Sequence, residues 1–138
     1  MTPHELKKLL QSKGLEIYRT TAEEVILADR VRDNLLMDSG VAVRPAPLAI
    51  RLIVRAQSSV FPGEDADRLF TRVRATAQAA FAAGFSETQT KVVAILDPGD
   101  RSRTLDTAHE LWLERSVSSL DALEPEVRAA LALSKTAT

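Results

Sequence analysis

Residues 64–85 form the stretch that most constrains how this chain can fold. Apolar or small side chains recur there at steps of three and four residues, at Ala66, Leu69, Phe70, Val73, Ala77, Ala80, Phe81 and Gly84. This spacing places them on one side of a helix, in an arc of roughly 120°. Acidic residues at positions 64, 65 and 67 suit the positive end of the helix dipole, and Gly84 can end the helix. The pattern predicts a long amphipathic helix that covers a sheet.

A second arc of the same helix consists of small residues. Ala75, Ala79, Ala82 and Ala83 lie outside the apolar stripe. Small side chains let another helix approach closely, so we expect these alanines to form a homodimer interface with the same helix of a second copy. The high helix propensity of alanine explains the same residues on an exposed face equally well. The sequence leaves both interpretations open.

The composition is that of a globular domain and excludes several classes of site. With 138 residues, 45% of them hydrophobic, the chain suits a single domain over residues 1–138. The absence of cysteine excludes disulfides, thiolate catalysis and cysteine zinc sites. The net charge of -1 and the scattered basic residues argue against nucleic-acid binding. No apolar run approaches bilayer-spanning length, so we expect a cytoplasmic protein that does not bind membranes.

The N-terminal third contains one ambiguous segment. Residues 3–13 predict a short helix that Gly14 ends, and residues 15–19 predict a short strand. Residues 22–38 favour a helix, because Thr21 to Glu24 have the form of a capping box and apolar residues keep helical spacing. The alternative is a hairpin in which Asp33 and Asn34 form the turn.

The remaining segments predict strands and a final helix. Residues 48–57 form the strongest strand, residues 91–97 and 104–117 predict two more, and a last helix ends near residue 133. The expected fold class is α+β, a two-layer sandwich in which a mostly antiparallel sheet of four or five strands packs against a long central helix, with additional terminal helices.

Alternation along two of the strands predicts a surface that could bind a partner. Arg51, Ile53 and Arg55 share one face of the first strand, and Glu110 and Trp112 share one face of the last. Opposite charges on one sheet face are often cross-strand partners. An apolar centre with a charged rim is typical of a protein contact surface. We therefore expect these five residues to bind a protein partner, unless the terminal helices cover the face.

Catalytic and metal-binding motifs are weak throughout. His109 and Glu110 begin like a zinc motif, but Leu113 stands at the position of the second ligand. Nucleotide-binding loops and the nucleophile elbow have no match. We predict no catalytic residue, no metal and no cofactor. If the domain is instead a small enzyme or ligand-binding protein, His109, Asp106 and Arg51 are the polar groups that would line its pocket.

The hairpin alternative gives the element order helix, three strands, helix, two strands, helix. That order resembles the class I type III secretion chaperones and related small bacterial α+β proteins over nearly the whole chain. The resemblance implies a homodimer whose middle helix contributes to the interface and whose sheet faces bind an extended segment of another protein. The pI of about 6.1 is higher than is typical of those chaperones.

Three hypotheses for function follow. The first is a non-enzymatic, chaperone-like or adaptor-like protein-binding domain from a bacterium, acting as a homodimer. The second is the small enzyme or ligand-binding domain with a pocket near His109. The third is a toxin-immunity or regulatory protein that acts by occlusion.

Overall fold

The fold is α+β, with strands and helices spread along the whole chain. The structure is a computed structural model that describes residues 1–32 and 34–136. The elements in chain order are α1 (Pro3–Ser12), β1 (Ile17–Thr20), β2 (Val25–Arg32), β3 (Leu35–Pro45), β4 (Leu48–Gln57), α2 (Ala66–Thr76), α3 (Gln78–Ala82), β5 (Ser86–Asp97), β6 (Asp100–Ser116), a short 3₁₀ helix η1 (Leu120–Ala122) and α4 (Leu123–Thr136).

Hydrogen bonds order the strands β1-β2-β3-β4-β6-β5 in an antiparallel sheet. In the described residues, six strands and four α-helices are present, so the prediction of four or five strands was wrong. The chain divides into two compact units, of which unit 1 comprises Met1–Leu52 and Glu114–Thr136, and unit 2 comprises Ile53–Leu113. The prediction of a single domain stays a prediction.

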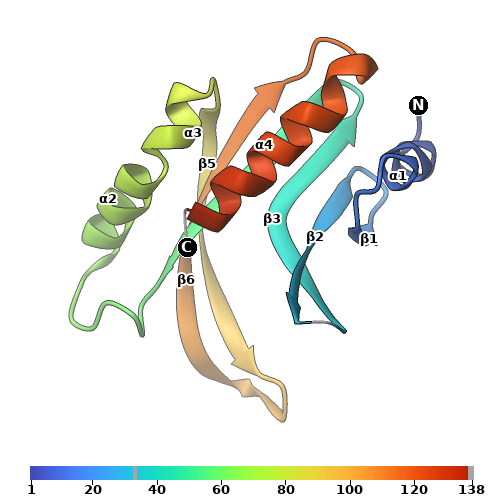
Figure 1. The fold of residues 1–138 in the computed structure, drawn as a ribbon. Helices are drawn as coiled ribbons and strands as arrows, with labels where there is room; N and C mark the ends of the chain where they lie inside the picture. The colour runs from blue at the N-terminus through green and yellow to red at the C-terminus, as the bar shows by residue number, and fades with distance from the viewer. Residues whose placement is uncertain (33, 137–138) are drawn as a thin grey trace. The chain divides into compact units, whose positions relative to one another are not determined.

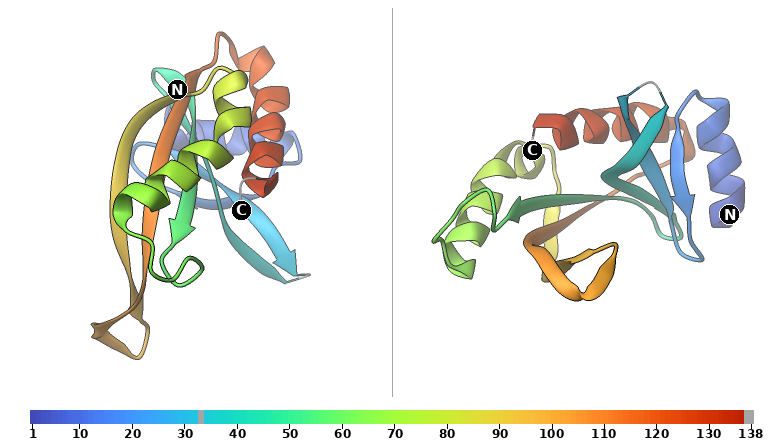
Figure 2. Two further views of the ribbon diagram at one scale, coloured as in Figure 1. Left: turned by 90° about the vertical axis from the view of Figure 1, so that its left-hand side faces the viewer. Right: turned by 90° about the horizontal axis from the view of Figure 1, so that it is seen from below.

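Unit 1 is built around the pairing of β2, β3 and β4. Val25 pairs with Val43, and Val43 pairs with Ile50, so the three share one sheet face. All three are fully buried. Helix α1 contacts β1, β2 and β3, and α4 contacts β3, as Figures 1 and 2 show for this unit. Aliphatic packing therefore supplies the core of unit 1.

Helix α1 and strand β1 confirm the elements predicted at 3–13 and 15–19. Thr2 and Glu5 form a capping box, in which the Thr2 hydroxyl accepts from the Glu5 amide at 3.2 Å. Leu6 and Leu10 are buried on one side of the helix. The local pattern was sufficient here because cap, apolar spacing and terminating glycine all agree.

The helix predicted over 22–38 was wrong, and the hairpin alternative is what the structure contains. Strands β2 and β3 occupy this part of the chain, and Asp33, to which a turn was assigned, lies outside the described residues. Thr21 and Glu24 make hydrogen bonds like those of a helix cap: the Glu24 amide donates to the Thr21 hydroxyl at 3.1 Å, and the Thr21 amide donates to the Glu24 carbonyl at 2.9 Å. They close a tight turn between β1 and β2. The same side-chain preferences serve both turns and caps.

The prediction of one long central helix over 64–85 was also wrong, because the structure contains two helices there. Helix α2 ends at Thr76, and α3 restarts at Gln78, with Ala77 between them at φ -80° and ψ 0°. The Thr71 and Thr76 hydroxyls and the Gln78 amide group donate to carbonyls four residues earlier, and such bonds bend helices. Two short helices therefore replace one long one.

The buried side of these two helices nevertheless follows the predicted stripe. Leu69, Val73, Ala77 and Ala80 are buried in unit 2. The Asp65 carboxylate caps α2 by accepting from the Arg68 amide at 2.9 Å. Gly84, at φ 93°, ends α3 in the left-handed conformation that glycine adopts without strain. In unit 2, α2 and α3 run beside the β5–β6 hairpin in both figures.

Candidate protein-binding surface

Three of the residues predicted to bind a partner meet on one sheet face of unit 2. The Arg55 guanidinium lies 3.1 Å from the Glu110 carboxylate, and the Trp112 indole N–H donates to the same carboxylate at 3.1 Å. The Glu110 side chain is only 9% exposed, whereas that of Arg55 is 44% exposed. A buried carboxylate thus holds an exposed cation and the indole in fixed positions.

Lys91, which the sequence reasoning missed, completes this group. Its ammonium lies 4.0 Å from the centre of the Trp112 ring, a cation–π contact between β5 and β6. We call Arg55, Lys91, Glu110 and Trp112 the Trp112 cluster. Finding Lys91 in advance would have required the pairing register of β5 against β6, which no local pattern in the sequence specifies.

The other two residues predicted to bind a partner, Arg51 and Ile53, differ from each other in unit and in burial. Arg51 belongs to unit 1, where its side chain is 5% exposed and its guanidinium lies 2.6 Å from the Glu24 carboxylate. A partner could not reach this buried pair. Ile53 begins unit 2 and is half-buried, two residues before Arg55 on β4. Ile53 therefore stays with the candidate surface, and Arg51 does not.

Asp106, on β6, forms hydrogen bonds with the segment that follows β4 in unit 2. Its carboxylate accepts from the Ser59 hydroxyl at 2.5 Å and from the Ser59 amide at 3.0 Å. These bonds, the hydroxyl first, lower the pKa of Asp106 below its ordinary value. Asp106 thereby ties the segment after β4 to β6, which accounts for its polar contacts without a substrate.

His109 points into the interior of unit 2. Its ring meets the Phe70 ring edge to face, with 5.3 Å between centroids, and the side chain is buried. Two pockets in the described part of the chain, one lined by residues of 14–16, 28–30, 39 and α4 and one lined by residues of 64–72, do not include His109, Asp106 or Arg51 in their linings. Within residues 1–32 and 34–136, no group of three or more His, Asp or Glu side chains is placed to hold a metal ion.

The four alanines predicted to form a dimer interface no longer share one continuous helix. Ala75 lies on α2, Ala79 and Ala82 lie on α3, and Ala83 caps α3. Ala75, Ala79 and Ala82 are exposed, and Ala83 is half-buried. The break at Ala77 interrupts the straight ridge that close helix packing needs.

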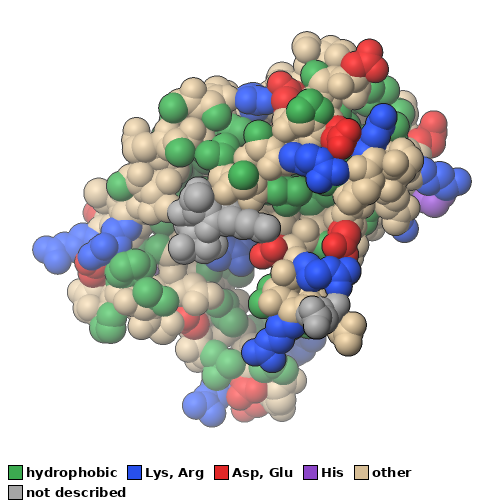
Figure 3. All heavy atoms as spheres, viewed as in Figure 1, with side chains coloured by type: hydrophobic (Ala, Val, Ile, Leu, Met, Phe, Trp, Pro, Cys, Tyr) green, Lys and Arg blue, Asp and Glu red, His purple; other side chains and the backbone are tan. Residues whose placement is uncertain are grey.

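Strand β5 presents apolar side chains to solvent next to the Trp112 cluster. Val92 is 59% exposed, Val93 39% and Leu96 42%, and β5 ends the strand order of the sheet. Figure 3 shows hydrophobic and charged side chains together at the tip of the β5–β6 hairpin. Exposed apolar side chains concentrated on one strand are typical of a contact surface.

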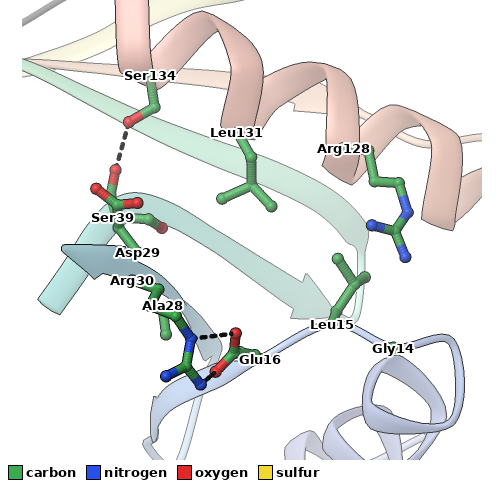
Figure 4. A pocket seen from close by; sticks show the side chains of 10 residues that line it. All are labelled: Gly14, Leu15, Glu16, Ala28, Asp29, Arg30, Ser39, Arg128, Leu131 and Ser134. Carbon is green, nitrogen blue, oxygen red and sulfur yellow. Dashed lines mark hydrogen bonds and ion pairs between the residues drawn. The ribbon is translucent and has the colours of Figure 1, made fainter. Parts of the chain in front are cut away.

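Unit 1 contains a pocket of about 250 Å³, lined by α4, by strands β2 and β3 and by residues 14–16, which precede β1. Figure 4 shows Arg128 and Leu131 reaching from α4 toward Leu15 and Glu16. Three of the charged groups drawn there are held by ion pairs: Arg30 binds Glu16 at 2.6 Å, and Arg128 binds Glu124 at 3.0 Å. The pocket therefore offers a ligand few charged groups that are not already engaged.

Comparison of the chain with models of protein families, with curated proteins and with solved structures finds no match. Among the helices of the described residues, none has both the length and the apolar character needed to cross a membrane. The function has to be inferred from the geometry alone.

Proposed function

We propose that this chain is a non-enzymatic, cytoplasmic protein-binding domain of the chaperone or adaptor type, which acts as a homodimer. The observation that carries the proposal is the Trp112 cluster on the sheet face of unit 2. Its buried carboxylate fixes Trp112 and Arg55, and Lys91 lies against the ring. Tryptophan and arginine are the residue types that most often dominate the free energy of protein binding.

The charges of the cluster favour one kind of partner. Arg55 is exposed beside its partner carboxylate, and Lys91 adds a second cation, whereas Glu110 is buried. The surface that a partner meets is therefore basic with an aromatic centre. A complementary partner is an extended segment in which acidic side chains flank an apolar one.

The element order supports the same proposal. With residues 25–45 as strands, the chain runs helix, strands, two short helices, two strands, helix. It differs by one strand from the order that resembles class I type III secretion chaperones, because four strands rather than three precede the middle helices. The resemblance supports an extended protein segment as the bound partner.

Synthetic peptides test the proposal directly. Peptides that alternate aspartate with valine or leucine should change the fluorescence of Trp112, the chain's single tryptophan, and peptides with lysine in place of aspartate should not. In calorimetric titrations of the acidic peptide, Trp112→Ala should weaken binding about thirtyfold, as expected for an aromatic side chain that a bound partner covers. Arg55→Gln should also weaken binding.

The matched control is Tyr18→Ala, because Tyr18 is an exposed aromatic residue on β1 of unit 1. Circular dichroism should show that all three variants fold. Equal affinity of the wild type and the folded Trp112→Ala variant for the acidic peptide, or equal binding of acidic and basic peptides, would contradict the proposal.

A further inference from the structure

Strand β5 lacks most of the features that usually protect the edge of a sheet, and its charged residues lie outside the apolar run 92–96. It is twelve residues long and unbroken, it ends the strand order, and residues 86–97 contain no proline. Ten of its twelve residues are exposed, and none is buried. Native edge strands are usually short, bulged, charged or covered, because their unpaired backbone groups bind other strands.

The sequence of residues 91–97 is self-complementary in one antiparallel register. If a second copy pairs with Ala94 opposite Ala94, Val93 faces Ile95 and Val92 faces Leu96. In the same register, Lys91 faces Asp97 at both ends of the pairing. Each apolar residue meets an apolar residue, and each charge meets its opposite.

We propose that β5 pairs with β5 of a second copy of this chain in the register centred on Ala94. This inference deepens the proposed function, because it assigns the homodimer interface to a strand edge instead of the alanine arc. Both copies use the same strand, so the contact closes with two copies and does not propagate into a fibre.

Other registers match the side chains less well. Pairing β5 over its whole length would place Glu87 opposite Leu96 and Thr88 opposite Ile95. A polar or charged residue opposite an exposed aliphatic one gains little from pairing. The register centred on Ala94 gives up strand length but matches all seven positions in type.

The contacts of the charged residues in the single chain are compatible with this pairing. Lys91 lies over the Trp112 ring, and its four-carbon stem is flexible enough to reach across the strand edge. Asp97 accepts the Gly99 amide at 2.9 Å through Oδ1. Pairing of Lys91 with the second copy's Asp97 adds a contact to each of these groups.

Charge reversal on one strand, followed by mixing, tests both the interface and its register. Lys91→Asp alone places aspartate opposite aspartate twice, and Asp97→Lys alone places lysine opposite lysine twice. Each variant alone should dimerise at least about tenfold more weakly than the wild type. In an equimolar mixture of the two variants, both contacts join one lysine and one aspartate, so the dimer should return.

The measurement is sedimentation velocity of each variant and of the mixture, with thermal melting to show that each variant folds. Should Asp97→Lys fail to fold because it loses the bond to Gly99, Val92→Lys replaces it, and Val60→Lys, an exposed valine outside the strands of unit 2, is its control. Only the strand variant should become monomeric.

A wild-type monomer at millimolar concentration, or a mixture that stays monomeric while both variants fold, would overturn the β5 interface. Neither result would affect the peptide titrations, which use Trp112→Ala and Arg55→Gln. Conversely, loss of peptide binding by the wild type would leave the self-association data standing. Binding of the acidic peptide and pairing through β5 can therefore fail separately.

Discussion

The two edge strands of the sheet, β1 and β5, differ in how well their edges are protected from pairing with another strand. Strand β1 has four residues, its register against β2 shifts between Ile17 and Arg19, and α1 contacts it. Strand β5 has twelve residues and exposes Val92, Val93 and Leu96. Short length, irregular pairing and a covering helix protect an edge, and exposed aliphatic residues leave it able to pair. One edge is closed, and the other remains available to a second copy.

Strand β4 shows a similar contrast along its own length. Arg51 and Arg55 are four residues apart and point to the same face of the strand. In unit 1, the Arg51 side chain is 5% exposed and paired with Glu24, whereas in unit 2 the Arg55 side chain is 44% exposed and paired with Glu110. Identical side chains on one face thus differ in exposure: Arg51 forms an internal ion pair, and Arg55 forms one that is open to solvent.

The largest expected effect is on the free energy of unfolding, when a buried aliphatic side chain beside the β1 edge is shortened. Leu27 on β2 pairs with Ile17 and is fully buried, so Leu27→Ala should cost about 3 kcal/mol of unfolding free energy through the cavity it leaves. Leu96→Ala on β5 removes an exposed side chain and should change stability by less than about 0.5 kcal/mol. Urea denaturation of both variants checks this, and equal losses would contradict the contrast between the edges.

The two arginines of β4 give the next largest difference. Glu24→Gln leaves the buried Arg51 guanidinium without its carboxylate and should cost about 3 kcal/mol. Arg55→Ala removes a guanidinium that is 44% exposed, and the Trp112 indole still donates to Glu110, so this change should cost less, about 1 kcal/mol. Chemical denaturation of the two variants measures both. A cost for Arg55→Ala as large as that for Glu24→Gln would show that the two pairs are equally internal.

Lysine substitutions on β5 and on β1 should differ in their effect on dimerisation and not in their effect on stability. Val92→Lys on β5 should leave the melting temperature nearly unchanged and weaken dimerisation about tenfold or more, because an edge lysine opposes strand pairing. Tyr18→Lys on β1 should change neither quantity. Sedimentation across a concentration series compares them, and weaker dimerisation of the Tyr18 variant would point to β1 as the pairing edge.

The smallest effect concerns the segment that follows β4. Because the Ser59 hydroxyl lowers the pKa of Asp106, Ser59→Ala should raise that pKa toward its ordinary value. A lowered pKa in the folded state contributes stability above the unfolded pKa, and this contribution is lost as the pH falls through the folded value. The variant should therefore lose less stability than the wild type on acidification. An NMR pH titration of the Asp106 carboxyl carbon measures the shift, and an unchanged pKa would contradict it.

Local periodicity was sufficient for much of the fold. Alternation along β4 and the three- and four-residue spacing of Leu69 and Val73 both describe how a single segment meets the core, so a single segment encodes them. The same alternation brought Arg55, Glu110 and Trp112 together as candidates for the surface. To predict these three residues, it was sufficient to know which face of its strand each side chain points to.

The features that the sequence did not predict depend on contacts between distant segments, or on hydrogen bonds that occur in more than one kind of local structure. Thr21 and Glu24 make hydrogen bonds that serve a helix cap and a tight turn equally, so the pattern could not choose between helix and hairpin. Lys91 joins Trp112 only through the register of two strands. The burial of Arg51 depends on Glu24, twenty-seven residues away.

Molar mass in solution tests the central claim most directly, namely that the β5 edge is held open for a second copy. Light scattering coupled to size exclusion, run from micromolar to millimolar protein, should show the mass rising from the 15.1 kDa of one chain toward twice that value, and Val92→Lys should need at least about tenfold more protein to reach the same mass. A wild-type mass that stays at 15.1 kDa over the whole range, or a Val92→Lys variant that doubles its mass as readily as the wild type, would contradict the account.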